Sequence, residues 1–312
     1  MNIIATAILL VITLLIVLVV SFFFGTPLGA AEMGALQSLL WILLVAWLSC
    51  FVLGELTANV SQVDKVWSIL PIVYTWTVAV HADFSPRVLL MALLVTAWGL
   101  RLTYNFSRHG AYQWKFWTGH EDYRWQVLRE KPEFKPRWRW TLFNLGFISG
   151  YQNVLILMMT LPTVVAMQFS ETPIGPIDYL ACVLAVVMLC YETVADNQQW
   201  RFQTEKAAAI RTADISNPDL TKGFLDRGLW AYSRHPNYFA EQGFWIALYL
   251  FSISASGQWM NWSIAGSILL VILFRGSSTF SEEISAAKYP AYAGYQRRVP
   301  RFVPPLRRLM SR

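Results

Sequence analysis

The sequence predicts an all-α integral membrane protein, a single domain built as a bundle of about eight transmembrane helices. Of its 312 residues, 55% are hydrophobic and only 14% are charged, and the mean hydropathy is +0.41. Long apolar runs without charge alternate with shorter polar connections, and several of these runs have the length of a membrane-spanning helix. A soluble globular domain does not have this composition.

Eight apolar segments are the expected spans, and two of them are short. They cover residues 2–24, 36–54, 66–82, 86–106, 142–168, 177–197, 238–255 and 260–276. The third and the seventh also fit re-entrant segments, so seven helices are an alternative count. The first lacks a basic n-region and a small-residue cleavage site. We therefore interpret residues 1–24 as an additional, retained helix and not as a signal peptide.

The basic residues predict which side of the membrane carries the polar loops. Residues 101–140 hold nine Lys and Arg, 197–238 hold six and 275–312 hold eight, which together make 23 of the 25. Eight crossings place these three segments on one side, together with Lys65 but not Arg87. Because cytoplasmic loops carry an excess of Lys and Arg, this side is expected to face the cytoplasm.

Several classes of site are not indicated by the sequence. The net charge of +6 is explained by the cytoplasmic loops, so we expect no nucleic-acid partner. The three cysteines lie in apolar runs without a CxxC pair, which predicts neither a disulfide framework nor zinc. No GxGxxG, Walker, HExxH or GxSxG motif occurs, so we expect no metal and no Rossmann or P-loop nucleotide site.

The stretch GLWAYSRHPNYFAE, from Gly228 to Glu241, joins a polar loop to an apolar helix. Ser233 or His235 is expected to cap that helix, and Pro236 suits its first turn. Backbone N–H groups at such an end are expected to point outward and to attract phosphate. Glu241 falls inside the apolar segment, where a carboxylate is costly and by default indicates function.

Other polar residues are predicted at the same depth, near the cytoplasmic ends of the helices. They form stripes at i, i+3, i+4 and i+7 spacing: Arg101, Tyr104, Asn105 and Arg108 on the fourth span, and Glu192, Asp196 and Gln199 on the sixth. Glu55 and Asp64 lie at the corresponding end of the second and third spans. Arg108 also fits a snorkelling anchor and Glu55 a structural role. Two acids one turn apart, as in Glu192 and Asp196, repel each other unless they have partners, which favours a functional network.

Three segments of the C-terminal half carry a family resemblance. ETVADNQQWRF, GLWAYSRHPNYFAE and SEEISAAKYPAYAGYQRRVPRFVP together resemble the C-terminal half of the steroid 5-alpha-reductase-like membrane enzymes. VDKVWS, WGLRLTYNFSRHG and HEDYRW resemble a bacterial branch of that group, and the resemblance covers residues 55–305. The RHPNY and EE…Y…Y…RVP elements are shared with isoprenylcysteine carboxyl methyltransferases and phospholipid methyltransferases, which use S-adenosylmethionine.

The resemblance implies a cofactor cavity that opens to the cytoplasm, with residues 141–305 as the cofactor-binding half. Asn237, Tyr238 and Glu241 match the reductase motif NYFGE, in which Asn and Glu contact the dinucleotide. Asp196 matches an intramembrane Asp of the reductases. The remaining positions implied at the cofactor are Arg201, Arg234, His235, Tyr292 and Arg298.

Residues 55–140 are then the expected substrate and proton-donor half. The Gln-Glu pair that donates a proton in the family has no clear match, so Glu55 or Asp64 would replace it, and Tyr104 would replace the family Tyr. The resemblance implies an oxidoreductase of a bacterial inner membrane that uses NADPH to reduce a conjugated C=C bond in a lipid or 3-oxo-steroid.

Two other interpretations remain open at this point. One is an S-adenosylmethionine-dependent membrane methyltransferase that acts on a lipid or a prenyl-cysteine carboxylate, because the shared elements specify a cofactor-binding half and not a reaction. The other is a non-catalytic membrane scaffold, which accounts for the apolar helices but not for the acidic stripes.

Overall fold

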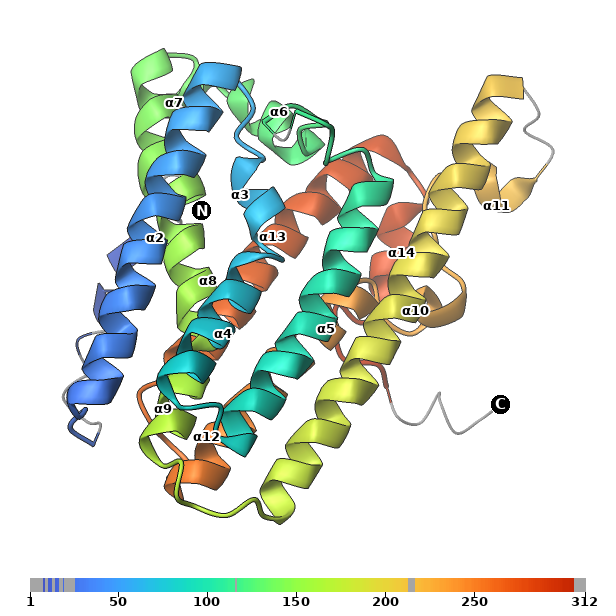
Figure 1. The fold of residues 1–312 in the computed structure, drawn as a ribbon. Helices are drawn as coiled ribbons and strands as arrows, with labels where there is room; N and C mark the ends of the chain where they lie inside the picture. The colour runs from blue at the N-terminus through green and yellow to red at the C-terminus, as the bar shows by residue number, and fades with distance from the viewer. Residues whose placement is uncertain are drawn as a thin grey trace. The chain divides into compact units, whose positions relative to one another are not determined.

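Every regular element in the described part of the chain is a helix (Figure 1). The structure, a computed structural model, describes residues 26–115, 117–212 and 217–305 and a few isolated positions before residue 26. The helices divide into two compact units. Unit 1 comprises Met1–Cys182 and Ile246–Leu270, and unit 2 comprises Val183–Trp245 and Val271–Arg312. The prediction of an additional helix over residues 1–24 lies outside the described residues.

Unit 1 is built from the N-terminal helices. They are α2 (Ala30–Thr57), α3 (Gln62–Val66), α4 (Leu70–His81), α5 (Pro86–Arg108), α6 (Tyr123–Arg129), α7 (Arg137–Phe143), the π-helix η2 (Asn144–Tyr151), α8 (Gln152–Thr160) and α9 (Pro162–Gln168). The short helix α4 packs against α2, α5 and α8. Gly99 of α5 allows this close approach, because a Cβ there would lie 2.4 Å from the carbonyl oxygen of Ser68.

A buried ion pair joins α5 to the start of α10 (Pro176–Thr212) within unit 1. Arg87 Nε lies 2.8 Å from Asp178 Oδ1, and the two side chains are 3% and 1% exposed. The same guanidinium donates to the carbonyls of Thr172 and Pro173, and Ser254 Oγ donates to the Asp178 carboxylate. Arg87, the one basic residue expected on the opposite side from the others, therefore has its charge neutralised within the fold.

Unit 2 contains the polar ends of three long helices and a C-terminal extension. α10, α12 (Pro236–Ser256) and α13 (Ile264–Lys288) run through both units, whereas α11 (Pro218–Thr221), the 3-10 turn η3 (Gly228–Ala231) and α14 (Tyr292–Arg298) belong to unit 2 alone. Its small apolar core consists of Phe224, Tyr292, Tyr295 and Val299, with Tyr289 packed against it.

Five helical segments in the described part of the chain are long and apolar enough to cross a membrane. They are Ala30–Thr57, Pro86–Arg108, Arg137–Gln168, Pro176–Thr212 and Ile264–Lys288. Each overlaps one predicted span. The third and seventh predicted spans, the two that also fit re-entrant segments, correspond to α4 and α12, which are not among the five. The all-α fold is confirmed for the described residues, and the five apolar helices support a membrane protein. The count of eight helices and the orientation remain predictions.

Candidate functional site

The turn immediately before α12 is hydrogen-bonded to the C-terminal segment of unit 2. The backbone N–H of Arg234 donates to the carbonyl of Pro300 at 2.9 Å, and that of His235 to Arg301 at 3.0 Å. Ser233 Oγ accepts a second bond from the His235 N–H at 3.2 Å. The expectation that these N–H groups point outward to bind phosphate is therefore wrong for both residues, because chain carbonyls already satisfy them.

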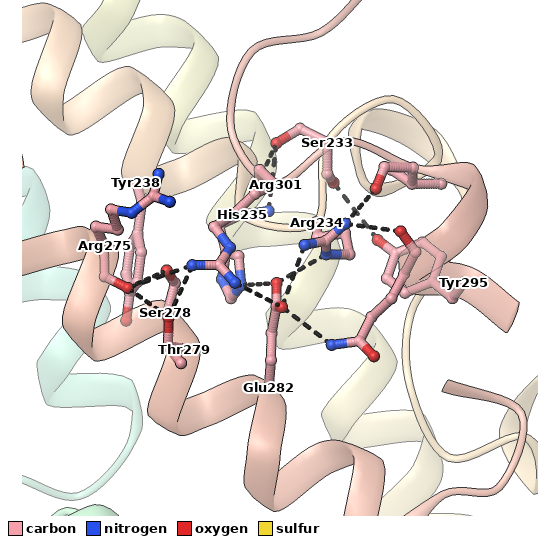
Figure 2. Close-up of polar contacts among 12 residues, drawn as sticks. Ser233, Arg234, His235, Tyr238, Arg275, Ser278, Thr279, Glu282, Tyr295 and Arg301 are labelled. Atoms are coloured by element: carbon pink, nitrogen blue, oxygen red, sulfur yellow. Dashed lines mark hydrogen bonds and ion pairs between the residues drawn. The ribbon is translucent and has the colours of Figure 1, made fainter. Parts of the chain in front are cut away.

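Glu282 of α13 is the centre of a buried polar cluster beside this turn (Figure 2). Its Oε1 accepts hydrogen bonds from Arg234 Nε at 2.7 Å and from His235 Nε2 at 2.9 Å. Its Oε2 accepts from Gln296 Nε2 at 3.1 Å and from Arg301 Nη2 at 3.4 Å. A buried charge is tolerated when it is paired and hydrogen-bonded, and Glu282 meets both conditions.

The surroundings of His235 favour the neutral form of its imidazole. Burial lowers the pKa of its imidazole below the usual range, and the hydrogen bond and charge of Glu282 oppose this only in part. A neutral imidazole that donates its Nε2–H to the carboxylate keeps Nδ1 as an acceptor. Its ring stacks on Tyr238, with centroids 5.2 Å apart and planes at 14°, and Tyr238 packs on Phe274. The Glu282 carboxylate and the Tyr238 ring thus fix the orientation of the His235 ring together.

A second polar contact joins α10 to α12 within unit 2. Asn237 Nδ2 donates to Asp196 Oδ1 at 3.2 Å, and Asn237 Oδ1 accepts the backbone N–H of Tyr238 at 3.0 Å. Glu241 lies one helical turn beyond Asn237, and both Asp196 and Glu241 are buried. The structure therefore brings together Asp196 and Asn237, two residues that the family resemblance assigned to a cofactor.

The other predicted cofactor residues of unit 2 have different environments. Tyr292 belongs to the small aromatic core, where its ring meets Phe224 edge to face at 5.0 Å. Arg298 is exposed at the end of α14 and Arg201 is exposed on α10. Tyr292 thus packs into a core, and the two arginines reach solvent.

Two of the predicted proton donors of unit 1 lie in packed surroundings. Glu55 accepts hydrogen bonds from Thr141 Oγ1 at 3.0 Å and from Asn144 Nδ2 at 2.9 Å. Asn144 opens the π-helix η2, and short π-helical segments inside α-helices are frequent at functional sites. Asp64 accepts from Trp125 Nε1 at 2.9 Å. Burial and the nearby Asp122 charge raise the pKa of the Asp64 carboxyl.

Tyr104, the third predicted donor, is 63% exposed, with the Arg108 guanidinium 5.0 Å from its ring centroid. Within the described residues, no hydrogen bond joins Tyr104, Asp64 and Glu55 to one another. The three are therefore alternative donors and not a single relay.

A comparison with known protein families identifies the family of this chain. The model of a family described as "Protein of unknown function (DUF1295)" matches residues 50–299. The chain belongs to the DUF1295 family. DUF1295 is a steroid 5-alpha-reductase-like family, and the match includes every residue that the sequence analysis proposed for the site, from Glu55 to Arg298.

One curated relative is similar over most of its length. An uncharacterised protein of Schizosaccharomyces pombe is 36% identical over 286 residues, which cover 84% of this chain and 79% of the relative. No solved structure matches the chain. Two finer expectations remain predictions. One is that the chain belongs to a bacterial branch of the family, and the other is that its C-terminal half is shared with S-adenosylmethionine-dependent methyltransferases.

No sequence motif marked Glu282, Gln296 or Arg301 individually as site residues. Glu282 is one of two adjacent acids at the end of an apolar helix, and such a pair also suits an exposed helix end. The one signal in the sequence is the i+4 spacing of Phe274, Ser278 and Glu282, and the structure shows that all three are buried. A polar residue in register with a buried stripe predicts an inward-facing side chain.

Proposed function

We propose that this protein is an NADPH-dependent oxidoreductase that reduces a C=C bond conjugated to a carbonyl in a lipid or 3-oxo-steroid. The observation that carries the proposal is the Asp196–Asn237 contact of 3.2 Å in unit 2, with Glu241 one turn further along α12. These are residues that the resemblance to the steroid 5-alpha-reductase-like enzymes assigns to a dinucleotide.

The donor set of unit 2 suits a dinucleotide chemically. Carboxylates such as Asp196 and Glu241 accept hydrogen bonds from ribose hydroxyls and carboxamide N–H groups, and the Asn237 amide both donates and accepts. The ion pair between Arg234 and Glu282 fixes the turn that precedes Asn237, so the amide is held in place before a ligand arrives. NADPH, when bound, would supply the hydride.

The proposed proton donors come from residues 55–140. Reduction of a conjugated enone needs a group that stabilises negative charge on the carbonyl oxygen. The Tyr104 hydroxyl is the first candidate and the Asp64 carboxyl the second, because a raised pKa favours the protonated form of Asp64 that can donate. Glu55 follows as the third candidate.

A test uses the protein in detergent with NADPH deuterated at the nicotinamide C4 and a panel of 3-oxo-Δ4-steroids and α,β-unsaturated lipids. We expect consumption of NADPH, measured at 340 nm, and deuterium at the β-carbon of the reduced product. Transfer of a methyl group from labelled S-adenosylmethionine to a lipid, with no oxidation of NADPH, would replace the proposal by the methyltransferase. Absence of binding of both cofactors would favour the scaffold.

A further inference from the structure

A chain of hydrogen bonds leads from Glu55 into the interior of unit 1. Asn144 Nδ2 donates to Glu55 Oε1 at 2.9 Å, and Ser149 Oγ donates to Asn144 Oδ1 at 2.9 Å. One turn further along, Asn153 Nδ2 donates to the Ser149 carbonyl at 2.8 Å. Glu55 is half-buried, whereas Asn144, Ser149 and Asn153 are almost fully buried. The helix that begins as η2 and continues as α8 therefore carries polar side chains into the interior of the unit.

Two free polar atoms lie at the inner end of this chain. Within the part of the protein that the structure describes, Tyr74 Oη and Asn153 Oδ1 are buried and have no hydrogen-bond partner. Both residues are 0% exposed. The Cys50 thiol is hydrogen-bonded to the Asn153 side chain and lies within electrostatic range of Tyr74. The helices α2, α4 and α8, which pack against one another, thus bring these three side chains together.

The two free atoms define the chemistry of a ligand that fits between them. A buried polar atom without a partner costs stability, because it has lost its hydrogen bond to water. Tyr74 can donate through its O–H, and Asn153 Oδ1 can accept. An alcohol is complementary to this pair, because its oxygen accepts one hydrogen bond and its proton makes another. A ketone would satisfy Tyr74 alone, and an anion would be repelled by Asn153 Oδ1.

The position of α2 indicates that this alcohol belongs to a lipid. One face of α2 carries the buried Cys50, and another exposes Leu40, Leu44 and Leu48 at i+4 spacing, which suits a helix that borders the bilayer. A ligand that enters beside α2 therefore comes from the membrane and needs an apolar body. A buried water makes about three hydrogen bonds. The pair offers two, which leaves the third position on the oxygen for carbon.

We propose that unit 1 binds the hydroxyl group of a lipid alcohol between α2, α4 and α8. Tyr74 donates a hydrogen bond to the lipid oxygen, and Asn153 accepts one from the lipid O–H. The site lies within one unit and uses none of the residues assigned above to the dinucleotide or to proton donation. It is therefore independent of the function proposed above.

The test uses the purified protein in detergent and a long-chain alcohol that carries a photoactivatable diazirine beside its hydroxyl. We expect saturable labelling that maps to α2, α4 or α8. The unlabelled alcohol should compete for this labelling better than its methyl ether, which accepts a hydrogen bond but cannot donate one.

The two hydrogen-bonding residues should have distinguishable effects in competition experiments. Tyr74→Phe removes the donor, so it should weaken binding of both the alcohol and the ether by about fivefold, the loss expected for one hydrogen bond. Asn153→Leu removes the acceptor and is close in size. It should weaken binding of the alcohol by about the same factor, leave the ether unaffected and abolish the preference between them.

Tyr249→Phe is the matched control, because Tyr249 is also a buried tyrosine of unit 1 and its hydroxyl donates to the Trp259 carbonyl at 2.8 Å. This variant should leave labelling unchanged, even where it lowers the midpoint of thermal unfolding. Labelling that does not saturate, or equal competition by alcohol and ether in the wild type, would overturn the proposal without any variant. A changed midpoint in Tyr74→Phe with unchanged labelling would also overturn it, because ordered water would then occupy the pair. NADPH takes no part in these experiments, so neither result affects the proposed function.

Discussion

The guanidinium of Arg234 lies against the carboxylate of Glu282, with Nε 2.7 Å from Oε1 and Nη2 3.2 Å from Oε2. The two residues are 48 positions apart in the sequence and come from the start of α12 and from α13. Because this bidentate pair is buried, it fixes the turn that carries the predicted cofactor residues relative to α13.

Replacement of Glu282 by Gln should destabilise the protein strongly. Removal of one charge from a buried pair leaves the other uncompensated, which costs about 3–5 kcal/mol, and here two arginines lose their carboxylate. This loss of stability should appear as a lower midpoint of thermal unfolding in detergent. Glu283→Gln is the control, because Glu283 is the adjacent acid and is exposed. Equal midpoints for the two variants would show that the pair contributes little.

Stability should decline as the pH falls below neutrality, and His235 should account for part of the decline. Burial lowers the pKa of His235 in the folded state, whereas an unfolded histidine has a pKa of about 6.5. The unfolded chain therefore binds the proton more readily, and stability is lost as the pH falls through about 6.5.

The measurement is the unfolding midpoint between pH 7.5 and pH 5.5. His235→Gln should show a smaller loss over this interval than the wild type, and His120→Gln, at an exposed position, should behave like the wild type. A loss as large in His235→Gln as in the wild type would exclude His235 as a contributor.

Tyr104→Phe should separate proton donation from cofactor binding. The change removes one hydroxyl and keeps the ring under Arg108. If Tyr104 polarises the substrate carbonyl, turnover should fall by about 10²–10³, the loss expected for one oxyanion donor, with NADPH affinity unchanged. Asp64→Asn tests the second donor in the same assay. Full turnover in both variants would show that neither residue is the proton donor, and Glu55 would be the next candidate.

The topology prediction can be checked with reporter fusions. Fusions near residues 120, 215 and 305 should report the cytoplasm, and fusions near 30, 84, 172 and 257 the opposite side, because 23 of 25 basic residues lie in the first set of segments. A signal from the opposite side at residue 215 would contradict a cytoplasmic placement of Asp196 and Asn237.

The sequence predicted the helices well because their determinant is local. An apolar run must bury its backbone polar groups in a helix wherever it lies in a membrane, so five of the predicted spans reappear as long apolar helices. For the short spans over α4 and α12, the sequence could not distinguish a membrane crossing from a re-entrant segment. Their lengths fit a crossing and a re-entrant segment equally, and packing against neighbours decides between them.

The candidate site was predictable only where one segment carries the signal. Asp196 and Asn237 were identified from two short motifs, and the structure brings them together. The role of Glu282 depends on which of two adjacent acids faces inward, and its partners come from α12 and the C-terminal segment. Likewise, the N–H groups of Arg234 and His235 bond to carbonyls more than sixty residues away, a contact that no local pattern encodes.

The central claim is that unit 2 binds a nicotinamide dinucleotide, and equilibrium titration of the purified protein in detergent tests it most directly. Energy transfer from tryptophan to the nicotinamide can follow binding of NADPH, with S-adenosylmethionine added as a competitor. We expect saturable binding of NADPH that S-adenosylmethionine does not displace and that Asn237→Ala and Glu241→Ala weaken by about tenfold or more, the loss of one or two charge-assisted or buried hydrogen bonds. Saturable binding of S-adenosylmethionine without binding of NADPH would contradict the account.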